Sequence, residues 1–193
     1  MSYLTTNQGE LIYASPSSGT AKASFTSEVA INDTTGMGLP AHIPPDFWRG
    51  AGDGTLRTIM VRARGILSST ATPTYQFTLR LGTLASTTAV IALGSAALTT
   101  GSGVSNQIWE FEGEFNVRTF GTTAATATGH GEGLLTSSGT ANKIDPLWGG
   151  GASPGTFSTL DTTITNYFNF NVTCSASSGS NTITLHQLLV FGW

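Results

Sequence analysis

Charged residues are scarce in this 193-residue chain, at 10% of the sequence, against the roughly 25% that is typical of globular domains. Eight Lys and Arg residues stand against eleven Asp and Glu residues, which gives a net charge of −3. A chain with so few basic residues lacks the electrostatic footprint that binds nucleic acid or an anionic membrane. We therefore expect neither a nucleic acid nor a membrane among its partners.

Cysteine and long apolar runs are also lacking. The one cysteine, Cys174, excludes an intrachain disulfide and a zinc site built from several cysteines. No run approaches the roughly 18 apolar residues of a membrane-spanning helix. The first residues show no cationic segment followed by an apolar one, so we expect no secretory leader and synthesis in a cytoplasm.

Small hydroxylated and turn-forming residues take the place of charge. Gly, Thr and Ser together make up 76 of the 193 residues. This composition disfavours a helical bundle, because Gly and Thr are weak helix formers, and Thr favours β-structure. A disordered chain is also disfavoured, because 39% of the residues are hydrophobic.

Alternation of apolar and polar residues predicts an all-β fold. The clearest case is Gln107–Gly121, where Trp109, Phe111 and Phe115 alternate with glutamates, as in a half-buried strand. Turn-rich segments separate the candidate strands. The eight expected strands are Leu56–Ile66, Thr74–Gly82, Thr88–Leu93, Gln107–Gly121, Ala124–Leu135, Gly155–Thr163, Tyr167–Ser175 and Asn181–Trp193. Eight strands with long, variable connections favour a jelly-roll sandwich over an up-and-down barrel.

The first residues have a different character, because breakers surround two short strand-like pieces, residues 11–13 and 25–31. We expect residues 1–42 to form an extended N-terminal arm and residues 43–193 to form the jelly-roll domain. An ordinary frayed terminus is the alternative. If the arm packs on a neighbouring molecule, its apolar residues would make the contact: Tyr3, Leu4, Leu11, Ile12 and Tyr13.

The last expected strand, Asn181–Trp193, is apolar on both sides at its end. Strict alternation places Ile183, Leu185, Leu189, Phe191 and Trp193 on one face and His186, Leu188 and Val190 on the other. A strand that is apolar on both faces of a two-layer sandwich needs a further layer. Either the N-terminal arm or another chain would supply it.

Residues that could carry chemistry are few. Glu110, Glu112 and Glu114 share a strand face and could do acid–base or metal work, but a solvated strand face, or a pairing with Arg residues on a neighbouring strand, is the better account. His130, Glu132 and Asp145 could be assembled into a metal site only on paper, because nothing in their spacing enforces it. His42 and His186 have no catalytic partner nearby, and Cys174 belongs to a core pattern. We expect no enzyme, no cofactor and no metal.

Several segments in succession resemble a known family. They are Ile43–Trp48, Gly54–Thr70, Thr72–Gly82, Trp109–Gly121 and Asn181–Leu185. This order resembles the small jelly-roll structural proteins of tailed bacteriophages, in particular the trimeric decoration (cement) proteins of the head.

The resemblance implies a structural virion protein on the outer surface of a capsid. Such a protein would form a homotrimer and clamp neighbouring copies of the major capsid protein. The doubly apolar strand end then suggests a trimer interface of Leu188, Val190, Phe191 and Trp193. The alternative is a tail or fibre tip module that binds a host receptor or glycan, with Trp48, Tyr75 and Trp148 as candidate exposed aromatics.

Overall fold

The computed structural model describes residues 9–32, 37–38, 40–48, 57–117, 119–122, 125–135, 143–148 and 156–193. Between residues 123 and 159 the description covers the backbone alone. Almost all of the regular structure in this part is β-strand, as the alternation predicts, and η1 (Pro45–Trp48) is a short 3-10 helix. Among these residues, no helix has the length and apolar character required to cross a membrane.

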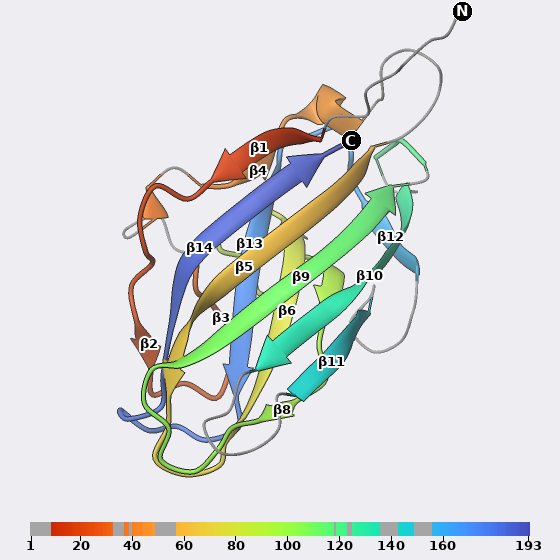
Figure 1. Ribbon diagram of the computed structural model, residues 1–193. Helices are drawn as coiled ribbons and strands as arrows, with labels where there is room; N and C mark the ends of the chain where they lie inside the picture. The colour runs from red at the N-terminus through yellow and green to blue at the C-terminus, as the bar shows by residue number, and fades with distance from the viewer. Residues whose placement is uncertain are drawn as a thin grey trace, which may run out of the picture.

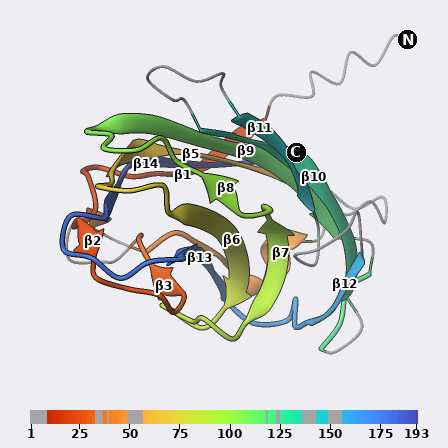
Figure 2. The same ribbon diagram turned by 90° about the horizontal axis from the view of Figure 1, so that it is seen from below.

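The strands form two antiparallel sheets that face each other (Figure 2). The first sheet has the order β1 (Glu10–Ala14), β14 (Thr182–Gly192), β5 (Thr58–Ser68), β9 (Gln107–Val117), β10 (Ala125–Leu135) and β11 (Lys143–Trp148), with β2 (Lys22–Ala23) beside β14 and β12 (Thr156–Leu160) beside β10. The second has the order β7 (Val90–Gly94), β6 (Thr74–Gly82), β13 (Asn166–Cys174) and β3 (Val29–Ala30), with β4 (His42–Ile43) beside β13 and β8 (Leu98–Thr99) beside β6. The two sheets are joined at one side, where β11 pairs with β7 through the backbone of Trp148 and Gly94.

All eight segments predicted to be strands contain one, namely β5, β6, β7, β9, β10, β12, β13 and β14. The predicted count of eight is nevertheless too low, because the described part of the chain also contains β1, β2, β3, β4, β8 and β11. Of these, β11 carries Pro146 inside the strand, opposite Glu132 of β10. Proline lacks the backbone donor that a strand interior uses, which is why the sequence pattern did not predict this strand.

Strands from the two ends of the domain pair with each other. The first long strand, β5, pairs with the last, β14, and the second, β6, pairs with β13, so that one strand pair is nested inside the other in sequence (Figure 1). Strand β5 also pairs along its full length with β9. These pairings place β14, β5 and β9 side by side as the central part of the first sheet.

Aromatic side chains fill the space between the sheets. Trp109 and Phe111 of β9 meet Phe77 of β6 and Phe170 of β13, and all four are fully buried. The Trp109 and Phe170 rings stack with centroids 5.7 Å apart, while Phe111 and Phe170 meet edge to face at 4.8 Å. Both arrangements suit the quadrupoles of aromatic rings. This cluster joins the two sheets at their centres.

Gly65 of β5 explains how the Trp109 indole fits. A Cβ at this position would lie 2.7 Å from the indole ring and would also collide with the carbonyl oxygen of Thr184 on β14. The glycine therefore lets the indole lie directly against the backbone of β5, where its Nε1 donates a hydrogen bond to the Ile66 carbonyl at 3.2 Å.

The N-terminal segment runs along one side of the sandwich, where β14 and β13 are the outer strands (Figure 1). Its strands β1 and β2 add to β14, and β3 and β4 add to β13. Ile31, Met37 and Ala41 are buried in the core. In the described part of this segment, residues 9–32, 37–38 and 40–42, these side chains belong to the core of the sandwich, as those of an extended arm would not. Residues 1–8 lie outside the described residues.

A pair of charged residues fastens this segment to the second sheet. Both carboxylate oxygens of Glu28 accept hydrogen bonds from Arg80 of β6, at 2.7 and 2.8 Å. Asn171 of β13 donates to the same carboxylate at 2.8 Å, and Arg80 also donates to the Ala89 carbonyl. We call this group the Glu28–Arg80 clamp. Burial by itself would raise the pKa of Glu28, but the hydrogen bonds from Arg80 and Asn171 and the Arg80 charge outweigh it and lower the pKa.

Candidate functional site

The outer face of the first sheet carries most of the residues that the sequence singled out. It consists of the side chains of β1, β14, β5 and β9 that point away from the core. Backbone register aligns them in three rows across the strands. The rows are Leu11–Phe191–Met60–Glu114, Leu189–Arg62–Glu112 and Gln187–Arg64–Glu110.

Two of these rows contain ion pairs. Arg62 Nε lies 2.6 Å from Glu112 Oε2, and Arg64 Nε lies 3.1 Å from Glu110 Oε1. The hydrogen bond from Glu112 raises the pKa of the Arg62 guanidinium. The prediction that these glutamates pair with arginines of a neighbouring strand is confirmed for Glu110 and Glu112. We call these two pairs the charge ladder. It neutralises the middle of the outer face.

The remaining row leads into an apolar area. Five apolar side chains lie together at the β1–β14 side of the face, and we call this group the apolar end. They are Leu11, Met60, Leu189, Phe191 and Trp193. Leu11 is 54% exposed, and the other four are partly exposed. The Phe191 and Trp193 rings lie 6.4 Å apart. The outer face thus combines an accessible apolar area with charges that are already paired, which lowers the cost of covering it.

The predicted faces of the last strand were wrong at one point. The register of β14 shifts between Leu185 and Gln187, as in a β-bulge. The extra residue, His186, reverses the alternation. Ile183, Leu185, Leu188 and Val190 therefore all face the core and are at most 1% exposed.

This shift divides the predicted trimer interface. Leu188 and Val190 are covered by their own chain, so they offer no surface to another molecule. Phe191 and Trp193 lie on the outer face, within the apolar end. Only these two of the four predicted residues remain available for a contact.

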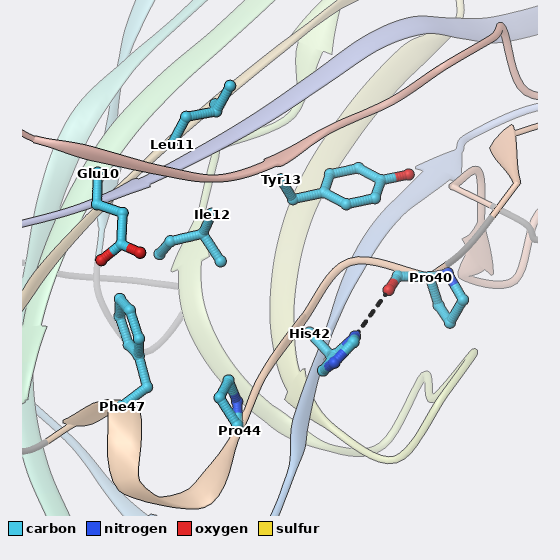
Figure 3. A pocket seen from close by; sticks show the side chains of 8 residues that line it. All are labelled: Glu10, Leu11, Ile12, Tyr13, Pro40, His42, Pro44 and Phe47. Atoms are coloured by element: carbon cyan, nitrogen blue, oxygen red, sulfur yellow. Dashed lines mark hydrogen bonds between the residues drawn. The ribbon is translucent and has the colours of Figure 1, made fainter.

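The five residues predicted to make the arm contacts also fall into separate groups. Tyr3 and Leu4 lie outside the described residues. Leu11, Ile12 and Tyr13 belong to β1, and a bulge between Leu11 and Tyr13 turns them to different sides. Figure 3 shows Leu11 on the far side of the strand, while Ile12 and Tyr13 point toward the segment that carries β4 and η1.

A pocket of about 410 Å³ lies between β1 and the β4–η1 segment (Figure 3). The residues that line it are Glu10, Leu11, Ile12, Tyr13, Pro40, His42, Pro44 and Phe47. Of these residues, sequence reasoning assigned Leu11, Ile12 and Tyr13 to contacts of the arm, and it found no catalytic partner near His42. No sequence signal links residues 10–13 to residues 40–47, because their proximity depends on the pairing of β1 with β14 and of β4 with β13.

The other residues considered for catalysis or metal binding do not form a site in the described part of the chain. Searched as far as the structure describes it, the chain has no group of three or more metal-ligating side chains. The side chains of His130, Glu132 and Asp145 lie outside the described residues. His186 shares a 2.7 Å hydrogen bond with Ser18, on the exposed surface. Cys174 is a buried free thiol, as predicted.

Two of the three aromatic residues proposed for receptor or glycan binding are buried. Trp48 and Tyr75 are 0% exposed. Trp48 packs near Phe115, with ring centroids 6.4 Å apart, and burial raises the pKa of Tyr75. Both residues belong to the core and offer no ligand platform. The side chain of Trp148 lies outside the described residues.

No protein-family model matches this chain, and a search of curated proteins found no relative.

Proposed function

We propose that this chain is a structural virion protein of a tailed bacteriophage. In this proposal it forms a homotrimer on the outer surface of the capsid and clamps neighbouring copies of the major capsid protein. The proposal includes no catalytic activity and no cofactor. It rests on the resemblance of the strand segments to phage decoration proteins, and on the surface chemistry of the first sheet.

The observation that carries the proposal is the composition of the outer face. The apolar end offers Leu11, Met60, Leu189, Phe191 and Trp193 for contact, and the adjacent charge ladder is neutralised within the chain. Covering such a face leaves few unpaired charges to desolvate. We assign the trimer contact to Phe191 and Trp193 and the capsid contact to Leu11 together with Tyr3 and Leu4.

The nested pairing of β5 with β14 and of β6 with β13 supports a jelly roll, which is the finer form of the fold that we propose. In a jelly roll, strands from the two ends of the chain pair successively inward. Rigid strands of this kind suit a protein that holds neighbouring capsid proteins together, because little conformational entropy is lost when they bind a lattice.

The test is to mix the purified protein with undecorated phage heads and to measure the temperature at which the heads release their DNA. Binding that raises this temperature supports the proposal. If the protein neither sediments with the heads nor raises the release temperature, the proposal is wrong.

A pair of variants locates the contact. Phe191→Ser changes the apolar end, whereas Leu84→Ser removes a more exposed apolar side chain (44% exposed) in the loop after β6, away from the apolar end. We expect Phe191→Ser to abolish trimers in light scattering and attachment to heads, and Leu84→Ser to retain both. Equal behaviour of the two variants would remove the apolar end from the proposal.

A further inference from the structure

The pocket between β1 and the β4–η1 segment has the dimensions of a ligand site. Its volume of about 410 Å³ falls within the roughly 300–1,000 Å³ of small-molecule pockets. Both of its walls are anchored, since β1 pairs with β14 and β4 pairs with β13. The pocket is therefore formed before any ligand binds.

Its walls are mostly apolar and conformationally restricted. Ile12, Pro40 and Pro44 present aliphatic surface, while Tyr13 and Phe47 contribute aromatic rings. The Tyr13 hydroxyl donates to the Met37 carbonyl at 3.4 Å, and the Arg57 guanidinium lies 4.2 Å from the centre of the Phe47 ring. Burial raises the pKa of Tyr13, so its hydroxyl stays neutral at neutral pH. These contacts hold both rings in place at little entropic cost to a ligand.

Two polar groups stand among the apolar walls. Glu10 has one carboxylate oxygen, Oε2, 3.2 Å from Arg57 Nη1, and Oε1 remains able to accept hydrogen bonds. The His42 Nδ1 donates to the Pro40 carbonyl at 3.1 Å, because a carbonyl oxygen can only accept. Its Nε2 is therefore an acceptor in the neutral ring. The His42 ring also packs on Tyr167, with centroids 5.7 Å apart.

This combination excludes several ligand classes. No Lys or Arg is among the lining residues, and Glu10 would repel a phosphate. One carboxylate and one imidazole are too few ligands for a stable cation site. A hydrocarbon chain would place apolar atoms against the remaining acceptors, Glu10 Oε1 and His42 Nε2, which is costly.

A pyranose ring can contact both the apolar walls and the two polar groups of the pocket. Its C–H faces can pack on aromatic and proline surfaces, since the face of an aromatic ring is electron-rich, and its hydroxyls can donate to the carboxylate and the imidazole. We propose that this pocket binds a neutral sugar ring, such as the terminal residue of a glycan, between Tyr13, Phe47 and the two prolines, with Glu10 and His42 accepting hydrogen bonds from its hydroxyls.

The test uses the free protein, so its outcome is independent of the proposed capsid role. Saturation-transfer difference NMR would be recorded with the methyl pyranosides of glucose, galactose, mannose and N-acetylglucosamine. We expect saturation transfer to at least one of them. Absence of transfer to all four would overturn the proposal.

Three variants locate the binding. Ile12→Trp fills the pocket with a larger apolar side chain and should abolish the signal. Glu10→Gln should weaken binding about tenfold, because a hydrogen bond to a charged acceptor is stronger than one to an amide. Glu112→Gln makes the same change in the charge ladder and should leave binding unaltered. Thermal melting of each variant verifies that it is folded. A signal that persists in folded Ile12→Trp would place the sugar elsewhere and refute the assignment.

Discussion

The two sheets both carry Arg–Glu pairs on their outer surfaces, but the pairs differ in depth and in what they join. In the Glu28–Arg80 clamp, the side chains are 19% and 13% exposed, and the pair joins the N-terminal segment to the second sheet. In the charge ladder, Arg62 and Glu112 are 35% and 47% exposed, and they join two strands that already pair along their whole length.

The difference shows that residue type alone does not define the role of an ion pair. The ladder lies close to water, where solvent screens the attraction and the net contribution is small. The clamp is partly removed from water and each partner makes further hydrogen bonds, to Asn171 and to Ala89. Loss of one partner there leaves the other without compensation. We therefore expect the clamp to matter for folding and the ladder to matter for the character of the surface.

The largest effect is expected from Glu28→Gln. This variant removes the charge that faces Arg80 and weakens its two hydrogen bonds, and it should lower the free energy of unfolding by about 2 kcal/mol. The matched variant Glu112→Gln should lower it by less than about 1 kcal/mol. Urea unfolding of both variants at neutral pH measures the two costs. Equal costs would mean that depth does not separate the clamp from the ladder.

Acid should abolish the difference in unfolding free energy between the wild type and Glu28→Gln. The folded state holds the pKa of Glu28 below its ordinary value of 4.5. A group with a lowered folded pKa contributes stability above its unfolded pKa and loses that contribution as the pH falls through the folded pKa. The stability gap between the wild type and Glu28→Gln should therefore be constant above about pH 4.5 and shrink below it. Urea unfolding from neutral pH down to about pH 3 measures this gap. A gap that stays constant over this range would contradict the role of the clamp.

The smallest effect is expected within the ladder. A double-mutant cycle with Arg62→Ala and Glu112→Ala should give a coupling energy of about 0.2–1 kcal/mol. Because both side chains are accessible, about 1 M salt should reduce the coupling further. The same cycle with Glu28→Ala and Arg80→Ala should give a larger coupling that salt changes less. A coupling in the ladder as large as that in the clamp would break the comparison.

Much of the fold could be predicted from the sequence because the long strands are half-buried. A strand with one face in the core and one outside must alternate, and Trp109, Phe111 and Phe115 against Glu110, Glu112 and Glu114 show this clearly. The pairing of these glutamates with arginines was also foreseeable, since β5 presents Arg62 and Arg64 with the same period.

The bulge in β14 has a sequence signal that strict alternation overlooked. Two polar residues, His186 and Gln187, stand between Leu185 and Leu188, so the apolar positions skip a residue there. A break of this kind indicates a β-bulge. Counting from the break places Leu188 and Val190 in the core and Phe191 on the outer face, as found.

The N-terminal segment gave a weaker signal, since its two strand-like pieces, residues 11–13 and 25–31, overlap β1 and β3, and the pocket gave none. Strands of two residues, such as β2, β3 and β4, are too short to show a period. Their positions depend on the free edges of β14 and β13, which exist only after the sandwich has formed. The pocket joins β1 to the β4–η1 segment across the two sheets, and the burial of Trp48 and Tyr75 likewise depends on packing between distant segments.

The sequence by itself therefore determined the all-β class, the eight strands that alternation predicts and the core-facing residues of β6, β9 and β13, because local alternation reports burial directly. The tertiary structure decided which strands are neighbours and how the N-terminal segment closes the sandwich. It also decided which charges are sheltered and which residues form the pocket. These features depend on contacts between residues far apart in the chain, and no local pattern encodes them.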